Sequence, residues 1–304
     1  MKIALIYGGN TSEGVVSKMS KNGIFNALKE LNYNVIEIEF DNNIVENIKK
    51  SQANIVFNGM YGQYGEDGFL SGILDLLKIP YTHNGRLASG LSMNKEYCNK
   101  IFTSAGIPVN KNIVLTKNDL ISGQWKNIVK SQKMFDNVEL FIKPTACGSS
   151  IDCMPINLEF DFSQYQFKTH CNRFFIEKKI IGKEITACYF DNKVIGAVEI
   201  VPKNKFYDFE SKYSQGGSQH IKPTISEESL NKIYNYTQIA HNEIGLRTIS
   251  RSDFIIDNND NIYLMDVNSN PGMTPQSLVP DIAKQIGMTF NDIIKTLIDN
   301  AMFD

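Results

Sequence analysis

The first part of the chain alternates between strand-like and helix-like hydrophobic patterns. Residues 2–7, KIALIY, form a short apolar run, and residues 12–31 have apolar positions at helical spacing, with Ser12 as the expected N-cap. Two further strand patterns follow, NVIEIEF and NIVFNG. Strand, helix and strand at this spacing predict a parallel α/β domain over residues 1–91.

The pattern changes in the rest of the chain. A helix through Lys95 and strands near residues 112 and 140 predict a small central domain over residues 92–172. From residue 173 onward, strand-rich stretches surround a predicted loop at 202–223 and a predicted helix at 226–244. Two late strands, RSDFIID and NIYLMDV, then complete a third domain over residues 173–304. Division into several domains is typical of a chain of 304 residues.

Charge and hydropathy restrict the class of partner. The chain has 31 basic and 33 acidic residues and a formal net charge of -2, so it lacks the basic surface typical of proteins that bind nucleic acid or anionic membranes. No run of about 18 apolar residues is present, and the N-terminus has no cleavage site. We therefore expect a cytoplasmic protein with a small-molecule partner and no nucleic-acid or membrane partner.

Cysteine and histidine usage disfavours two kinds of site. The five cysteines are an odd number without any C-x-x-C pair, which is typical of free thiols in a reducing compartment. The four histidines are widely separated. A zinc site or a Ser-His-Asp triad therefore has few residues from which to form.

Polar side chains occur where the last predicted strand ends, in IYLMDVNSNPG. Alternation along this strand places Asp266 and Asn268 on one face, and the neighbouring strand RSDF adds Asp253. Oxygen ligands of this kind suit Mg²⁺, which takes further ligands from water and substrate phosphates. Asp and Asn at a strand end are also typical of turns, so this stretch alone leaves both interpretations open.

A second candidate site is the glycine-containing stretch FIKPTACGSSID. Lys143 ends an apolar strand, and Gly148, Ser149 and Ser150 follow in a loop of small residues. Backbone N–H groups of such a loop can bind phosphate oxygens, and the lysine adds a positive charge. The stretch is not a P-loop, because its lysine precedes the glycine, and a plain flexible loop is an equal alternative.

These stretches, with others, resemble the D-alanine:D-alanine ligases of the ATP-grasp superfamily over nearly the whole chain. The resemblance implies an α/β (α+β) ATP-grasp fold, in which an N-terminal parallel α/β lobe precedes a two-lobed unit that holds a nucleotide between two antiparallel sheets. It also implies a homodimer. The matching segments, in order, are GGNTSEGVVS, GQYGEDGFLSGILDLLKIPYTHNG, SMNKEYCNKIF, IKPTACGSS, FIEKKIIGKEITA, FYDFESKY, RSDF and DVNSNPGMTPQSLVP.

The resemblance implies residues that bind ATP and metal ions. Without it, lysines and acids at these positions would be expected to face solvent and Phe206 to be a core residue. The implied ATP-binding residues are Lys95 and Lys143 at the phosphates, Glu177, Lys178, Lys179 and Ile180 at the adenine, Glu184 at the ribose, Phe206 at the base, and Lys212. The implied ligands of two Mg²⁺ ions, with Mn²⁺ as an alternative, are Asp253, Asp266 and Asn268.

The implied activity joins two D-alanine molecules for peptidoglycan synthesis. ATP phosphorylates the carboxylate of the first D-alanine, and the amine of the second attacks the acyl phosphate. By the resemblance, Arg251 and the Gly272 N–H match the family's oxyanion-stabilising groups. A hydrogen-bonded trio that holds a loop at 203–222 is matched by Glu13, Ser149 and Tyr213. Substrate binding is assigned to Glu13 for the first D-alanine and to Tyr61, Ser277 and Leu278 for the second.

Several positions depart from the family pattern. Tyr61 replaces a histidine, Asp152 replaces a glycine, Asp266 replaces a glutamate, and Gly14 and Val15 replace an Arg-Glu pair. Asp152 would repel phosphate if its charge pointed into the loop. Two alternatives therefore stay open: a ligase with another second substrate, such as D-serine or D-lactate, and a nucleotide-binding relative with little turnover.

Overall fold

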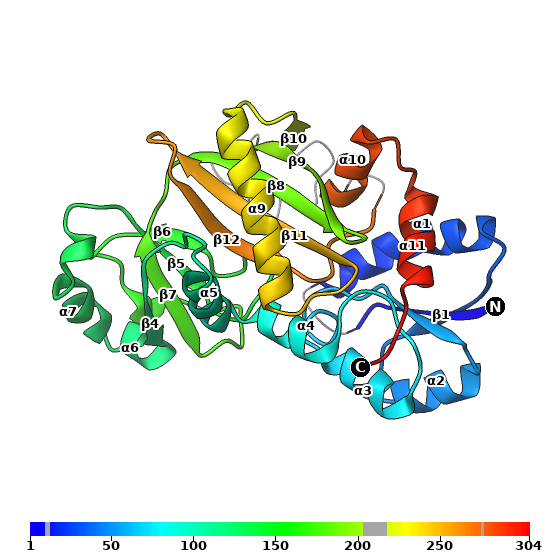
Figure 1. The fold of residues 1–304 in the computed structure, drawn as a ribbon. Coiled ribbons are helices and arrows are strands. Elements are labelled where there is room, and N and C mark those ends of the chain that lie inside the picture. Colours follow the sequence, from blue (N-terminus) through cyan, green and yellow to red (C-terminus); the bar gives the residue numbers. More distant parts are fainter. Residues whose placement is uncertain (10–12, 203–217, 275–276) are drawn as a thin grey trace.

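The computed structural model describes residues 1–9, 13–202, 218–274 and 277–304, and the described strands form three β-sheets (Figure 1). The N-terminal sheet is parallel, with strand order β2-β1-β3. The central sheet, β4-β7-β5-β6, and the C-terminal sheet, β10-β9-β8-β11-β12, are antiparallel. The predicted fold, a parallel α/β part followed by two antiparallel sheets, is confirmed.

The N-terminal sheet forms around β1, whose central residues are fully buried apolar side chains. Residue Glu13, rather than Ser12, occupies the N-cap position of the first helix, without a side-chain capping bond, and Ser12 lies outside the described residues. The elements are β1 (Lys2–Tyr7), α1 (Gly14–Glu30), β2 (Asn34–Glu39), α2 (Ile44–Ser51), β3 (Ile55–Asn58), α3 (Phe69–Leu77) and α4 (Arg86–Met93).

The central sheet has its own hydrophobic core, in which Trp125 and Phe162 are fully buried and pack edge to face. Asn94 caps α5 by accepting the Glu96 N–H, so this helix begins at Lys95. The elements are α5 (Lys95–Ser104), β4 (Asn112–Thr116), α6 (Lys117–Ile121), α7 (Gln124–Lys130), η1 (Lys133–Phe135), β5 (Leu140–Pro144), β6 (Met154–Ile156), η2 (Phe162–Gln164) and β7 (Arg173–Lys178).

The C-terminal sheet contains one strand that the sequence did not predict. Within the predicted loop at 202–223, residues of β10 pair with β9 at the edge of the sheet. The polar sequence SQHI lacks the apolar residues that would predict a strand. The strand forms because its backbone pairs with a neighbour at the edge of the sheet. The elements are β8 (Gly182–Phe190), β9 (Lys193–Pro202), β10 (Ser218–Ile221), α9 (Glu227–Glu243), β11 (Ile249–Asp257), β12 (Ile262–Asn268), α10 (Leu278–Gln285) and α11 (Phe290–Asp299).

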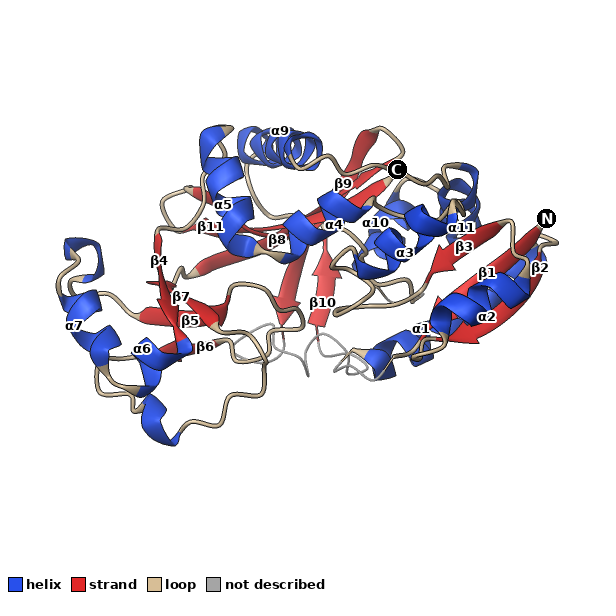
Figure 2. Cartoon of the chain, turned by 90° about the horizontal axis from the view of Figure 1, so that it is seen from below, coloured by secondary structure: helices blue, strands red, loops and turns tan. Residues whose placement is uncertain are grey.

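The helices cover the sheets with their apolar faces. The longest described helices, α1 and α9, have 17 residues each, and α9 lies across the face of the C-terminal sheet (Figure 2). Apolar side chains of α9 enter the same core as those of β8, β11 and β12. Within the described parts of the chain, every helix is too short or too polar to cross a membrane.

One hydrophobic core joins the two ends of the chain. Helix α11 packs against α1, and both lie at the same side of the molecule (Figure 1). Buried residues from β1 and α1, such as Leu5 and Leu28, share this core with Ile282 of α10 and Leu297 of α11. The last helices therefore complete the core of the N-terminal sheet, while the domain boundaries at 91 and 172 stay a prediction.

Candidate functional site

Strands β11 and β12 bring the late acidic residues together. They are antiparallel neighbours, and their register pairs Asp253 with Asp266 and Arg251 with Asn268. The burial pattern of β12 alternates around buried Val267, so Asp266 and Asn268 share the opposite face. The sequence-based prediction that Asp266 and Asn268 share one face, beside Asp253 on the neighbouring strand, is therefore confirmed, and their role as metal ligands stays a prediction.

Two cations lie against these carboxylates. The Arg251 guanidinium donates to both Asp253 oxygens, at 3.0 and 2.9 Å, and the Thr186 hydroxyl donates to Asp253 at 2.6 Å. Lys95 Nζ lies 3.2 Å from Asp266 Oδ1. Burial lowers the pKa of Lys95, but the Asp266 carboxylate together with Cys153 and Cys98 raises it above the usual value. Lys95 is therefore charged at neutral pH.

Lys95 also joins the central and C-terminal sheets. Its backbone N–H donates to the Thr145 carbonyl at 2.8 Å, and its Nζ donates to the Cys147 carbonyl at 3.2 Å. Both carbonyls belong to the stretch that follows β5. The lysine thus connects the glycine-containing loop of the central sheet to Asp266 on β12.

Lys143 on β5 has a buried partner that the sequence did not reveal. Its Nζ lies 2.9 Å from Glu177 Oε1 on β7, and the two side chains are only 10% and 2% exposed. The second Glu177 oxygen has no hydrogen-bond partner among the described residues. The Glu177 side chain is therefore held by Lys143, which limits its predicted role at the adenine to the backbone.

The rest of the predicted adenine-binding stretch leads out of β7. The Lys178 carbonyl accepts the Asn110 side chain at 2.7 Å, and the Lys179 N–H donates to the Glu139 carbonyl at 2.8 Å. These protein contacts fix the course of the stretch up to Ile180. Glu184, the predicted ribose ligand, lies on β8 and pairs with Ile200 of β9 and Ile255 of β11.

Glu13 lies between the N-terminal and central parts of the chain. It is 5% exposed, and a Cβ placed on Gly62 would lie 2.5 Å from its carboxyl carbon. A Cβ on Gly148 would lie 3.1 Å from Glu13 Oε1. Glycine at both positions thus permits a close approach of two loops to one carboxylate.

The Gly148 loop is tightly wound. Ser149, Ser150 and Asp152 all have left-handed backbone conformations, with φ of 54°, 56° and 54°. Such conformations cost energy for residues with side chains and are found where surrounding contacts hold them. Successive left-handed and right-handed residues can direct backbone N–H groups toward one anion.

The Asp152 carboxylate is hydrogen-bonded to other parts of the protein. It accepts the Tyr165 hydroxyl at 3.0 Å and the backbone N–H groups of Lys168 and Thr169 at 3.2 and 2.8 Å. The charge that the sequence placed in the loop is thus held by the segment 165–169. This contact anchors the loop to the segment that precedes β7.

Tyr61 contacts the turn that contains Gly272. Its hydroxyl accepts the Met273 N–H at 2.9 Å, and the neighbouring Met60 carbonyl accepts the Asn270 side chain at 2.7 Å. Tyr61 is 4% exposed. The N-terminal part of the chain therefore fixes the position of the turn on both sides of Gly272.

Ser277 and Leu278 lie just after this turn. The Ser277 hydroxyl accepts the Thr274 N–H at 3.0 Å, and a Cβ on Gly272 would lie 3.1 Å from that hydroxyl oxygen. Leu278 is the first residue of α10 and its side chain is part of the hydrophobic core. Only the backbone of Leu278 is therefore placed to contact a substrate.

Three other predicted site residues lie outside the described residues: Phe206, Lys212 and Tyr213.

Glu66 is a further acidic residue near these groups, which the sequence analysis did not single out. Burial raises the pKa of Glu66 to about 8, the charge of Glu13 adds to this effect, and Arg251 opposes it. Its backbone N–H donates to the Gly62 carbonyl at 2.8 Å. The signal in the sequence was its position in GEDG, five residues after Tyr61.

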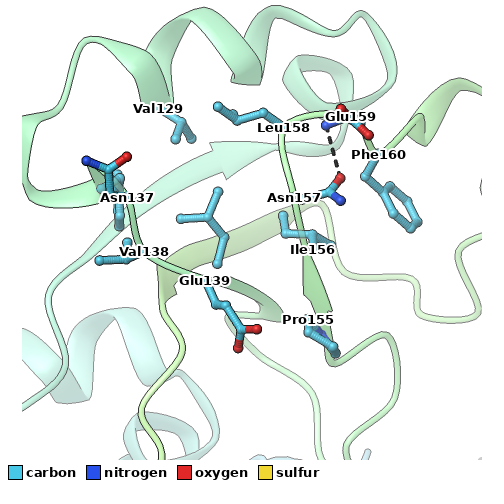
Figure 3. Close-up of a pocket in the computed structure, with 12 residues that line it drawn as sticks. Val129, Asn137, Val138, Glu139, Pro155, Ile156, Asn157, Leu158, Glu159 and Phe160 are labelled. Carbon is cyan, nitrogen blue, oxygen red and sulfur yellow. Dashed lines mark hydrogen bonds between the residues drawn. The ribbon is translucent and has the colours of Figure 1, made fainter.

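A separate pocket borders the predicted adenine-binding stretch through Glu139, which contacts Lys179. It has a volume of about 790 Å³ and lies beside the central sheet, between the ends of β5 and β6 and helix α7 (Figure 3). Its wall includes Val129, Val138, Ile156 and Phe160. None of the predicted site residues lines it, so it does not compete with the candidate site.

Comparison with known proteins identifies relatives over nearly the whole chain. Residues 101–299 match the family model described as D-ala D-ala ligase C-terminus. The chain is 35% identical to the D-alanine--D-alanine ligase of Wolbachia pipientis wMel over 99% of this chain and 94% of that protein. It is 36% identical to the ligase of Carboxydothermus hydrogenoformans over 98% of this chain and 97% of that protein.

Solved structures show the same fold. The D-alanine--D-alanine ligase of Bacillus anthracis has a TM-score of 0.81 at 26% identity and covers 99% of this chain and 97% of its own. The VanG D-Ala:D-Ser ligase of Enterococcus faecalis has a TM-score of 0.80 at 25% identity, with 98% of each chain covered. On the match of sequence and fold, this chain belongs to the D-alanine--D-alanine ligase family.

Proposed function

We propose that this protein uses ATP to join two D-alanine molecules into D-alanyl-D-alanine for peptidoglycan synthesis. The observation that supports this proposal best is the contact of Lys95 with both Asp266 and the Cys147 carbonyl. It joins the three parts that phosphoryl transfer requires: a cationic group, acidic residues for metal ions, and a glycine-containing loop.

ATP phosphates would bind to Lys95, Lys143 and the loop of Gly148, Ser149 and Ser150. Lys95 is close to Asp266, so a triphosphate in this position would lie between the central and C-terminal sheets. Catalysis of phosphoryl transfer depends on such positioning and on charge stabilisation. The backbone of residues 177–180 and Glu184 would receive the adenosine.

Magnesium fits the oxygen atoms of Asp253, Asp266 and Asn268. The two carboxylates are cross-strand neighbours and each already contacts a cation, Arg251 or Lys95. Among the described residues, no three His, Cys, Asp or Glu side chains gather into a metal site, so phosphate oxygens and water would complete the shell. We propose two Mg²⁺ ions, replaceable by Mn²⁺, which would offset the charge of the transferred phosphoryl group.

The acyl-transfer step would use the groups around the Gly272 turn. The amine of the second D-alanine attacks the acyl phosphate carbon, and negative charge develops on the former carbonyl oxygen. The Arg251 guanidinium and the Gly272 N–H would stabilise this charge. Tyr61 holds the adjacent Met273 N–H, which keeps the turn in one position.

The two amino acids would bind on either side of the acyl phosphate. Glu13, buried against Gly62 and Gly148, would pair with the ammonium of the first D-alanine. Ser277 and the backbone of Leu278 would bind the carboxylate of the second, because they begin α10 and the N-terminus of a helix favours anions. Tyr61 would border the same subsite.

We further propose a cytoplasmic homodimer, on the basis of the family resemblance. The net charge of -2 supports the proposal that nucleic acid is not a partner. Size-exclusion chromatography with light scattering would measure the oligomeric state. A monomer of 34.3 kDa at working concentration would contradict the dimer.

One alternative concerns the second substrate. Tyr61 replaces the family histidine in the second subsite, and one structural relative is named as a D-Ala:D-Ser ligase. The other alternative, a protein with little turnover, is less supported, because Asp152 binds the segment 165–169 and Asp266 contacts Lys95.

A product assay tests these functions against each other. The protein would be incubated with MgATP and D-alanine, alone and with D-serine or D-lactate, and products would be identified by mass spectrometry. We expect D-alanyl-D-alanine and one phosphate per dipeptide. Phosphate release that does not respond to any amino acid would contradict the ligase assignment, and a preferred mixed product would support the alternative substrate.

A further inference from the structure

Cys147 follows β5 and Cys171 precedes β7, beside the Gly148 loop. Strands β5 and β7 are antiparallel, and their pairing extends past the end of β5, because the Thr145 N–H donates to the Arg173 carbonyl at 3.0 Å. Extended by two more residues on each side, this register would place the two cysteines opposite each other. Opposite residues have Cα atoms about 4.5–5.5 Å apart, and disulfides span about 4.4–6.8 Å.

The two cysteines contact the same threonine, and the Thr145 hydroxyl oxygen lies 3.9 Å from Cys171 Sγ. Cys147 Sγ lies 2.6 Å from the Thr169 hydroxyl oxygen, which also accepts the Cys171 N–H at 3.0 Å. Both cysteines are half-buried thiols in this structure, so a small oxidant has a path to them.

The two thiols differ in how readily they ionise. The Cys147 thiol lowers the pKa of Cys171, and the Cys171 thiol raises the pKa of Cys147. Cys171 is therefore the more readily ionised of the two. By contrast, burial raises the pKa of Cys98 to about 12, and burial likewise raises that of Cys188. The thiolate is the nucleophilic form of cysteine, so these two buried thiols are inert by comparison.

Cys147 is also part of the candidate ATP site through its backbone. Its carbonyl accepts Lys95 Nζ at 3.2 Å, and its next residue, Gly148, lies against Glu13. A covalent bond at the Cys147 side chain would restrict the backbone that positions Lys95 and begins the Gly148 loop. A chemical change of this thiol would therefore act on phosphate binding.

We propose that Cys147 and Cys171 are a redox-active dithiol, a modification site for hydroperoxides, whose disulfide weakens ATP binding. The Cys171 sulfur attacks hydrogen peroxide, the O–O bond breaks, and a sulfenic acid forms with release of one water. The Cys147 sulfur then attacks this sulfur, the S–O bond breaks, and a second water leaves. The two thiols lose two electrons and two protons, which peroxide accepts. The effect on ATP rests on the proposed function.

Peptide mapping tests the dithiol without any reference to ATP. The full chain would be treated with hydrogen peroxide, its remaining thiols alkylated, and its peptides identified by mass spectrometry. We expect a Cys147–Cys171 disulfide, with Cys153, a third half-buried cysteine, as the internal comparison. Oxidation of Cys153 without this cross-link would overturn the proposal.

Alkylation rates test the assignment of the nucleophile. For an ordinary thiol, the fraction present as thiolate falls about 75-fold between pH 8 and pH 6. Alkylation of Cys171 by iodoacetamide should fall by less than about threefold over this range, because it is already ionised. A fall like that of an ordinary thiol would contradict the assignment.

Activity measurements test the coupling to ATP. We expect peroxide to raise the KM for ATP by about fivefold or more, since it disturbs a charged contact, and dithiothreitol to restore it. Cys171→Ser should keep the reduced activity within about twofold and resist peroxide. A disulfide without any change in KM would refute the coupling, whereas an absence of ATP turnover in the reduced chain would refute the proposed function instead.

Discussion

At the residue scale, the candidate site is held by charged side chains that neutralise one another. Asp253 pairs with Arg251, Asp266 with Lys95, and Glu177 with Lys143. Each cation is within reach of an anion in the free protein, so a bound phosphate would compete with a carboxylate for the same donor. Substitutions at these positions therefore affect stability as well as binding.

Replacing Lys143 with methionine should affect both properties. Loss of a charged phosphate contact should lower kcat/KM for ATP about 10- to 100-fold. Because Glu177 would remain buried without its partner, the variant should also lose roughly 3–5 kcal/mol of stability. The substitution removes no packed volume, so this cost comes from the broken ion pair.

The double variant Lys143→Met/Glu177→Gln separates the two effects. Without the buried charge it should recover most of the stability in urea denaturation, and its turnover should stay low. Normal ATP turnover in this double variant would show that Lys143 does not contact the phosphates.

Replacing Glu66 with glutamine should change how stability depends on pH. The raised pKa, about 8, means that the folded protein holds a proton that the unfolded chain releases near pH 4.5. The free energy of unfolding should thus fall as pH rises from about 4.5 to 8. Glu66→Gln cannot ionise, so at pH 8 it should be more stable than the parent by roughly 1–3 kcal/mol.

Urea denaturation in chelator at pH 5 and pH 8 measures this difference. The two proteins should have similar midpoints at pH 5, where Glu66 is protonated in the folded state. Equal midpoints at pH 8 as well would show that the Glu66 carboxyl is not perturbed.

At the element scale, the Gly148 loop depends on a contact with the segment 165–169. Asp152 holds three hydrogen bonds to this segment from a left-handed backbone position. The sequence analysis considered that the Asp152 charge could repel phosphate, but in the structure this side chain instead holds the loop in place. The shape of the loop is thus set by residues that lie beyond it in the chain.

Two substitutions of Asp152 distinguish the anchor from backbone strain. Asp152→Ala loses the hydrogen bonds and keeps the left-handed strain, so it should lose roughly 2–3 kcal/mol. Asp152→Gly loses the same bonds but tolerates φ of 54°, so it should be about 1 kcal/mol more stable than the alanine variant. Thermal denaturation ranks the three proteins, and an alanine variant as stable as the parent would rule out the anchor.

Local patterns predicted most elements and one pair of site residues. Apolar runs such as KIALIY and NIYLMDV identified β1 and β12, and two-residue alternation correctly placed Asp266 and Asn268 on one face. Strand β10 was not predicted, because its side chains are polar and it is formed by backbone pairing with β9. Contacts between segments that are far apart in the chain, such as Lys143 with Glu177, cannot be predicted from local periodicity.

At the scale of the whole molecule, the N-terminal sheet and the C-terminal sheet are joined by polar as well as apolar contacts. The Asn84 side chain donates to the Ile249 carbonyl at 2.7 Å and to the Ser269 carbonyl, and accepts the Arg247 N–H at 2.6 Å. It is 2% exposed. One side chain therefore satisfies backbone groups at the start of β11 and after the end of β12.

Replacing Asn84 with alanine should destabilise the molecule as a unit. Buried backbone groups would lose their partners, at a cost on the order of 3 kcal/mol or more. Asn54→Ala is a matched control, since Asn54 accepts the Lys2 N–H at an exposed position. Urea denaturation should show a large shift for Asn84→Ala and little for Asn54→Ala, and equal shifts would contradict this role.

The central claim is that ATP phosphorylates the carboxylate of D-alanine before the peptide bond forms. The most direct measurement uses D-alanine labelled with ¹⁸O in its carboxylate, MgATP and the purified protein, with the released phosphate analysed by mass spectrometry. We predict one ¹⁸O atom in each phosphate, transferred when the acyl phosphate breaks. Phosphate that carries no label would mean that water, and not the carboxylate, attacks ATP, and would contradict this account.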